Sequence, residues 1–201
     1  PTWVPFCREL WSSAEQQQNY LPGVPEGSDL CITPVSAPEN HYVRIKADNR
    51  LEADGTLRGT FTLTAEGQSD SNIRRIFTTG FQSEWKSTME RQLLVISPKA
   101  RLLSVDYGKN PKDYQAAPIK ITFRYEIPDY ALRGEGEMFF RPMVMNNLYN
   151  QVRSYMWIDT SVENRKYGFK DGCSRLVELD ETIQLPAGYK LVLSLIHISE
   201  P

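Results

Sequence analysis

The chain has 201 residues, and its 23 lysine and arginine residues nearly balance its 25 aspartate and glutamate residues, for a net charge of −2. This balance argues against a basic nucleic-acid-binding domain, and no apolar run is long enough for a transmembrane helix. Two histidines and three cysteines leave few side chains for acid–base or metal chemistry. A chain of this length buries enough surface to fold without a metal or a disulfide. We therefore expect a folded protein that needs no cofactor.

The first 40 residues are rich in proline. Six prolines and two glycines in this stretch exclude a central strand and a long helix, and only a short helix over 8–19 fits the pattern. Its aromatic side chains need a surface to cover, which is not typical of a disordered tail. The pattern predicts an irregular arm, residues 1–40, that docks on another surface through Trp3, Phe6, Trp11 and Tyr20.

A second, β-rich domain is expected over residues 41–192. Apolar and polar residues alternate on both sides of Asp54-Gly55, which predicts a β-hairpin. Residues 119–127 carry apolar side chains at odd positions only, as in a half-buried strand. We expect residues 134–140 to pair with that strand through a turn near Asp129. Further strands are predicted over 102–105 and 176–185, while 148–158 fits either a helix or a strand.

Between residues 73 and 96 the apolar residues are spaced mostly three or four positions apart, as on one face of a helix. The pattern predicts one long amphipathic helix, capped at its start by Ser69 or Ser71 and stopped by Pro98. Gly80 either kinks this helix or divides it in two. The apolar stripe consists of Ile73, Ile76, Phe77, Phe81, Trp85, Met89, Leu93 and Ile96. The predicted fold class is therefore α+β: a mainly antiparallel sheet covered by one long helix, with an irregular N-terminal arm.

The reactive side chains form no recognisable site. Cys7, Cys31 and Cys173 lack the spacing of zinc or redox motifs, so we expect no metal site. They are most simply small buried hydrophobes, although Cys7 and Cys31 would be able to form a disulfide in an oxidising compartment. A thiol nucleophile needs a base, and His41 is the available candidate. A hydrogen-bonded or solvent-facing linker histidine is the simpler interpretation of His41.

The last nine residues differ from the sequence before them. Residues 193–201 resemble the translation of a transposon adapter used in sequencing libraries, and we expect them to be an artefact that follows the natural sequence at about Val192. The alternative is a short apolar strand followed by a turn. Without this segment the loss of Glu200 changes the net charge from −2 to −1. We therefore assign no function to His197.

The N-terminal residues carry a family resemblance. Residues 1–6 (PTWVPF), 8–13 (RELWSS) and 20–27 (YLPGVPEG) resemble the region just after the catalytic core of bacterial transglutaminase-like proteins, a papain-like family. In that family a Cys–His–Asp triad performs acyl transfer or peptide hydrolysis, and its Asp commonly precedes Pro-Thr. The resemblance implies that the triad lies ahead of Pro1. No catalytic residue is therefore carried onto this chain.

The remainder of the chain extends the resemblance. Residues 42–192 look like the β-rich domain of unknown function that follows such cores in multidomain envelope proteins, on the features at Ser97-Pro98, 110–118 and 181–189. The resemblance implies a non-catalytic accessory domain that frames or presents a protein or peptide substrate. Its implied partner is the upstream core of the same protein, and its implied location is the periplasm or cell envelope.

Two other functions fit the same residues. One is a stand-alone extracellular peptide- or glycan-binding module with Tyr149, Tyr155 and Trp157 on a concave surface. The other is an enzyme that uses Cys7 or Cys31 with His41. A docking arm predicts an exposed apolar patch on the chain. A thiol within hydrogen-bond reach of the imidazole in a cleft would instead indicate the enzyme.

Overall fold

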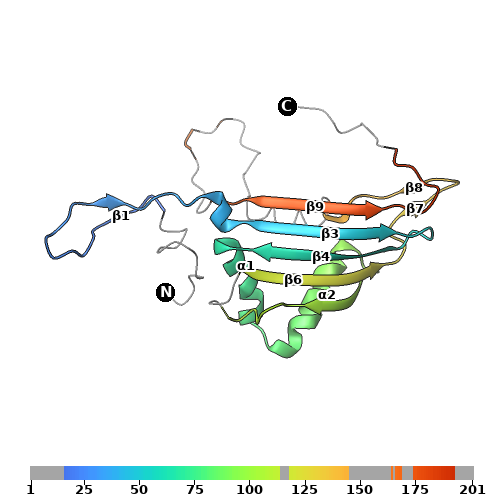
Figure 1. Cartoon of the computed structure of the whole chain (residues 1–201), viewed down its shortest axis with the longest axis horizontal. Coiled ribbons are helices and arrows are strands. Elements are labelled where there is room, and N and C mark those ends of the chain that lie inside the picture. The colour runs from blue at the N-terminus through green and yellow to red at the C-terminus, as the bar shows by residue number, and fades with distance from the viewer. Residues whose placement is uncertain (1–15, 114–117, 145–163, 165, 169–173, 193–201) are drawn as a thin grey trace.

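A five-stranded sheet with two helices on one face forms the body of the computed structural model, and a hairpin arm extends from one end of that body (Figure 1). The structure describes residues 16–113, 118–144, 164, 166–168 and 174–192. The predicted segment 148–158 and the C-terminal nonapeptide lie outside the described residues.

The sheet is antiparallel except at one edge. Its strands stand in the order β5-β6-β4-β3-β9. The pairs β3–β4, β4–β6 and β5–β6 are antiparallel, whereas β9 runs parallel to β3. The mainly antiparallel sheet predicted from the sequence is confirmed, with a parallel edge strand that the local pattern did not indicate. The strands are β3 (Val43–Leu51), β4 (Leu57–Ala65), β5 (Arg101–Asp106), β6 (Ile119–Ile127) and β9 (Val177–Gln184).

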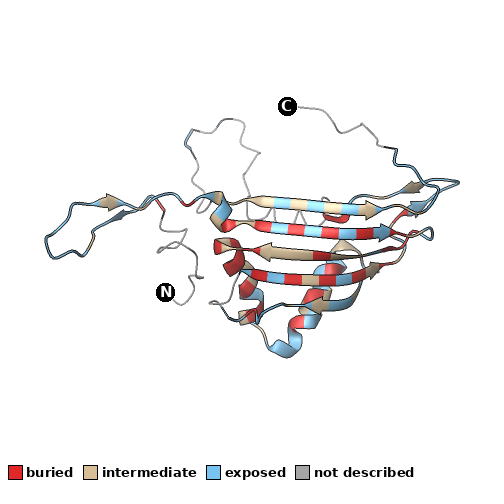
Figure 2. Cartoon of the chain, viewed as in Figure 1, coloured by how far each residue is buried: buried red, intermediate tan, exposed pale blue. Residues whose placement is uncertain are grey.

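Alternation along the strands divides the sheet into a core face and an open face. In β3 and β6 the odd-numbered residues are buried, and the even-numbered ones are exposed or half-buried (Figure 2). The turn between β3 and β4 contains Gly55 with φ +83°, a conformation that favours glycine, so the predicted hairpin is confirmed. The largest buried side chains on the core face include Ile45, Leu51, Leu57, Tyr125 and Ile127.

Two short helices replace the one long helix predicted from the sequence. Helix α1 (Gly67–Thr78) and helix α2 (Trp85–Ile96) are separated by Gly80, an extended Phe81 and a 3₁₀ turn, η3 (Gln82–Glu84). In a straight helix, residues eight positions apart lie about 12 Å apart along the axis. The break instead brings the buried rings of Phe77 and Trp85 into an edge-to-face contact with centroids 5.2 Å apart. Of the two effects predicted for Gly80, a kink or a division of the helix, the structure shows the division.

Residues 134–140 do not pair with β6, contrary to the prediction. Strand β7 (Leu132–Arg133) pairs with β8 (Met138–Phe139) in a separate two-stranded sheet. Asp129, with φ +51°, turns the chain away after β6. The N–H of Ala131 then donates to the carbonyl of Gly55 at 3.0 Å, which holds this segment beside the β3–β4 turn.

A buried ion pair on helix α1 contacts the residues on either side of the segment that connects β5 to β6. Arg74 Nε donates to Asp70 Oδ2 at 2.6 Å, and both side chains are at most 5% exposed. Arg74 Nη1 also donates to the carbonyls of Pro111 and Asp113, while Asp70 Oδ1 accepts from the N–H of Ile119. Because each charge has several partners, the burial of this pair is compensated, and residues 111–113 and the start of β6 are fixed to the helix.

Candidate docking surfaces

The arm is a hairpin with little structure of its own. Strand β1 (Asn19–Tyr20) pairs with β2 (Cys31–Ile32), and the pairing is extended by bonds between Thr33 and the main chain of Gln17 and Gln18. Such a short two-stranded ribbon is marginally stable in water. In Figure 1 it reaches away from the sheet rather than lying on it.

The arm exposes a run of large apolar side chains. Leu30 is 70% exposed and Ile32 is 66% exposed, although burial of such side chains is favourable. Neighbouring exposed apolar side chains on a monomer are typical of an interaction site. We call these residues the arm patch; they are Tyr20, Leu21, Val24, Leu30, Ile32 and Val35.

The base of the arm, in contrast, is fixed by buried polar contacts. The side-chain oxygen of Gln16 accepts from the N–H of Ser36 at 2.7 Å, and Ser36 Oγ lies 2.8 Å from His41 Nε2. All three residues are buried. The arm patch is thus carried on a firmly anchored base.

His41 caps helix α1 from outside the helix. Its Nδ1 accepts from the N–H of Gln68 at 3.0 Å, and its carbonyl accepts from Ser69 Oγ at 2.9 Å. The first N–H groups of a helix have no partner within it, so this contact replaces a side-chain cap. Glu66 at the cap position makes no side-chain cap bond, and Ser69 and Ser71 lie inside the helix, so the predicted serine cap is wrong.

Only glycine fits at the start of this helix. Gly67 has φ +61°, and a Cβ there would lie 2.1 Å from the carbonyl oxygen of Asn40 and 2.3 Å from His41 Nδ1. Both the conformation and the close approach exclude a side chain. Gly67 therefore permits the contact between His41 and the helix.

The hydrogen bonds of His41 determine its tautomer. Because Nδ1 accepts from a main-chain N–H, the proton of the neutral ring lies on Nε2, which donates to Ser36 Oγ. A general base for Ser36 would need the opposite arrangement, with Nε2 free to accept. The pair is therefore arranged for structure rather than for nucleophilic catalysis. The expectation of a hydrogen-bonded histidine is confirmed, in a buried setting rather than on the surface.

The predicted site residues are only partly described. Tyr20 lies on β1 and is 46% exposed. Cys31 lies on β2, where its thiol contacts the carbonyl of Asp29 at 3.6 Å, whereas the ring nitrogens of His41 bond to Ser36 and Gln68. The other predicted residues lie outside the described part of the chain: Trp3, Phe6, Cys7, Trp11, Tyr149, Tyr155, Trp157 and Cys173.

A polar network crosses the core face of the sheet. The hydroxyl of Tyr125 donates to Asn49 Oδ1, and Asn49 Nδ2 donates to Glu181 Oε1 at 2.8 Å. The carboxylate of Glu181 also accepts from the N–H groups of Met143 and Val144, at 3.1 and 2.9 Å. The network therefore ties residues 143–144 to the sheet through satisfied hydrogen bonds.

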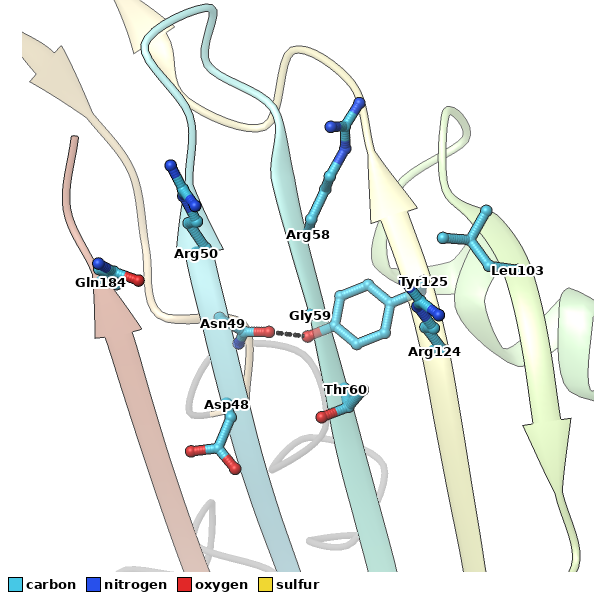
Figure 3. A pocket seen from close by; sticks show the side chains of 10 residues that line it. All are labelled: Asp48, Asn49, Arg50, Arg58, Gly59, Thr60, Leu103, Arg124, Tyr125 and Gln184. Atoms are coloured by element: carbon cyan, nitrogen blue, oxygen red, sulfur yellow. Dashed lines mark hydrogen bonds between the residues drawn. The ribbon is translucent and has the colours of Figure 1, made fainter.

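The network depends on Gly59 of β4, which has no side chain to block it. Asn49, Gly59 and Tyr125 are direct neighbours across three strands, and Figure 3 shows the phenol of Tyr125 reaching past Gly59 to Asn49. A Cβ at Gly59 would lie 2.0 Å from Asn49 Oδ1 and 2.5 Å from the carbonyl oxygen of Asp48. Burial and the charge of Glu181 raise the pKa of Tyr125, so its hydroxyl remains a donor.

The opposite, open face of the sheet is polar and holds a shallow pocket. The pocket has a volume of about 350 Å³. Figure 3 shows the residues that line it, which extend across the sheet from Gln184 on β9 to Leu103 on β5. The open-face residues of β3, β4, β6 and β9 that line it are Asp48, Arg50, Arg58, Thr60, Arg124 and Gln184, and Asn49, Gly59, Leu103 and Tyr125 complete the lining.

The described part of the chain offers neither a metal site nor a membrane-spanning helix. In that part of the chain, no group of histidine, cysteine, aspartate and glutamate side chains is placed to hold a metal ion. No helix among those residues is long and apolar enough to cross a membrane. The polar pocket and the arm patch are the two candidate binding sites in the described residues.

Comparison with known proteins identifies no relative: no family model, no curated protein and no solved structure matches the chain.

Proposed function

We propose that the chain is a non-catalytic accessory domain of a transglutaminase-like protein, and that its arm docks on the catalytic core that precedes it in the same polypeptide. In this position the β-rich domain frames or presents a protein or peptide substrate to the core. The proposed location is the periplasm or cell envelope, where the resembling proteins act.

The observation that carries the proposal is the contrast between the two ends of the arm. Its base is buried and hydrogen-bonded through Ser36 and His41, whereas its tip exposes Leu21, Leu30 and Ile32 to solvent. An anchored element with unburied apolar side chains gains stability when a second surface covers them. The resemblance of residues 1–27 to the region after a transglutaminase-like core supports that core as the covering surface.

The first test is the reading frame upstream of Pro1 in the source DNA. The proposal expects a transglutaminase-like domain there, with its cysteine and histidine ahead of an aspartate adjoining Pro1. A different domain in that frame would overturn the proposed partner.

The second test measures binding between the chain and that upstream domain, produced separately. The double variant Leu30→Glu and Ile32→Glu is expected to weaken binding at least about tenfold, because it places charges in a desolvated apolar contact. The matched control is the double variant Leu132→Glu and Phe139→Glu, which changes exposed apolar residues of β7 and β8 outside the arm. Equal weakening by both variants, or binding that neither changes, would contradict docking through the arm.

A further inference from the structure

The open face of the three central strands is positively charged although the chain as a whole is negative. The even-numbered residues of β3, β4 and β6 point away from the helices. Asp48 and Glu126 are the acidic side chains among them. The basic ones are Arg44, Lys46, Arg50, Arg58, Lys120 and Arg124. The open side of these three strands, which we call the cationic face, therefore carries a formal charge of +4 in a chain of net charge −2, and Glu178 and Asp180 of the edge strand β9 lie beside it.

Half of these basic side chains are already paired. Arg58 contacts Glu126 at 2.8 Å, Arg50 contacts Glu52 at 3.3 Å, and Arg44 pairs with Glu178. Such exposed pairs contribute little to stability, but they reduce the local positive charge.

The other three basic side chains are without such partners. Within the described part of the chain, Lys46, Lys120 and Arg124 make no ion pair or side-chain hydrogen bond. Arg124 lies beside Thr60 at the pocket, and Lys46 lies one row away on β3. These three side chains are available to a ligand that carries negative charge.

The composition of the face favours a polypeptide over other anionic ligands. No aromatic side chain occupies the open-face positions of the three strands, so the face offers no platform for stacking bases. Asp48 and Glu126 lie among the basic residues and would repel a uniformly charged polyanion. A polypeptide is able to place carboxylates at some positions and a neutral or basic side chain at others.

The spacing of the face also fits an extended chain. Residues on one side of an extended strand repeat about every 7 Å, and neighbouring strands lie about 4.8 Å apart. Lys120 and Arg124 are two such repeats apart on β6, with Thr122 between them, and Lys46 lies two strands away on β3. Carboxylates four residues apart in an extended segment that runs along β6 would therefore meet Lys120 and Arg124.

We propose that the cationic face binds an extended acidic polypeptide segment, whose carboxylates contact Lys46, Lys120 and Arg124. The segment crosses the pocket between Asp48 and Arg124, where Thr60 and Gln184 offer additional hydrogen-bonding groups. This inference goes beyond the proposed function, because it concerns a different surface and holds whether or not the arm docks.

The test uses the whole chain and a fluorescein-labelled peptide of alternating glutamate and serine, about twelve residues long. Fluorescence anisotropy is expected to show binding that weakens with salt, and the double variant Lys46→Glu and Arg124→Glu is expected to weaken it at least about tenfold. The control double variant, Arg75→Glu and Lys86→Glu, makes the same charge change on the helices behind the sheet and is expected to change binding less than about twofold. Circular dichroism verifies that both variants remain folded.

Several results would overturn the proposal. Equal weakening by the control would show that net charge, and not the cationic face, determines binding. Tighter binding of dextran sulfate or of phosphatidylglycerol vesicles than of the peptide, lost in Lys46→Glu and Arg124→Glu, would assign the face to a polysaccharide or a lipid surface. Self-association of the chain that the same variant abolishes would assign it to a second copy. A peptide of alternating lysine and serine should not bind, and binding of that peptide would also contradict the inference.

Discussion

His41 Nε2 lies 2.8 Å from Ser36 Oγ, yet the two residues form a structural contact and not a nucleophile–base pair. The main-chain N–H of Gln68 donates to Nδ1 of the same ring and places the proton on Nε2. The imidazole thereby joins the base of the arm to the first turn of α1. Both ring nitrogens are occupied by hydrogen bonds, one to the hydroxyl of Ser36 at the base of the arm and one to the main-chain N–H of Gln68 in the helix.

Loss of this imidazole should destabilise the protein. His41→Ala leaves the N–H of Gln68 without its acceptor, so the free energy of unfolding is expected to fall by about 1–3 kcal/mol. Glu39→Ala, in the same 3₁₀ turn and exposed, is the control and is expected to change it by less than about 0.5 kcal/mol. Urea denaturation measures both values, and equal losses would contradict a specific role for His41.

A reactivity test addresses the same residues. Because Nε2 donates to Ser36 Oγ, the hydroxyl is not activated, and a fluorophosphonate probe is expected to leave Ser36 unlabelled. Mass spectrometry of the treated chain provides the measurement. Stoichiometric labelling of Ser36 that His41→Ala abolishes would show a working nucleophile and would contradict the proposed tautomer.

Gly59 should tolerate no side chain. Gly59→Ala places a Cβ against the main chain of Asp48 and the amide of Asn49, which displaces the hydrogen bond from Tyr125. We expect the free energy of unfolding to fall by about 2–4 kcal/mol. Gly134→Ala is the matched control, because nothing lies within 4 Å of its added Cβ. Thermal or urea denaturation distinguishes the two, and an unchanged Gly59→Ala variant would contradict the close approach.

Breaking the buried ion pair between Asp70 and Arg74 should lower the free energy of unfolding. Arg74→Met leaves Asp70 buried without its cation, which is expected to cost about 3–5 kcal/mol of stability. Arg75→Met, at the exposed neighbouring position, is expected to cost less than about 0.5 kcal/mol. Adding Asp70→Asn to Arg74→Met should restore part of the loss, because the uncharged amide is cheaper to bury. A double variant no more stable than Arg74→Met alone would argue against an uncompensated charge as the cause.

Alkaline pH should destabilise the protein through the buried Tyr125 and the half-buried Tyr130. Burial, together with the charge of Glu181, raises the pKa of Tyr125 and of Tyr130 above the ordinary value of 10.0. The unfolded chain therefore releases these protons first, and stability is expected to fall as the pH rises above about 10. Absorbance at the tyrosinate band should show that both groups ionise only on unfolding, with a smaller step in Tyr125→Phe. Reversible ionisation of Tyr125 in the folded protein near its ordinary pKa would contradict its burial.

The sequence predicted the turns and strands that are determined by neighbouring residues in the chain. Asp54-Gly55 indicated the β3–β4 turn, and the odd-numbered apolar residues of 119–127 indicated β6. The division of the helix was ambiguous, because the apolar interval of four residues continues across Gly80 and Phe81. The extended conformation of Phe81, which is 77% exposed, depends on the packing of Phe77 against Trp85 and was not encoded in the periodicity.

The contacts that organise the candidate sites join distant residues, so the sequence alone did not indicate them. His41 meets Gln68 across 27 positions, and Asn49 meets Glu181 across 132 positions. The parallel pairing of β9 with β3 has no local signal either, because a strand pattern does not specify its neighbour. Gly59, a glycine inside a strand pattern, was the available signal for the close approach at Asn49.

Hydrogen exchange of the arm tests the docking proposal most directly. Residues 16–37 are measured by mass spectrometry in the chain alone and in the parent polypeptide that includes the sequence upstream of Pro1. If the arm patch is covered by the preceding core, the main-chain amides around Tyr20 and Ile32 should exchange at least about tenfold more slowly in the longer protein. Equal exchange rates at these residues in the two proteins would contradict the docking of the arm.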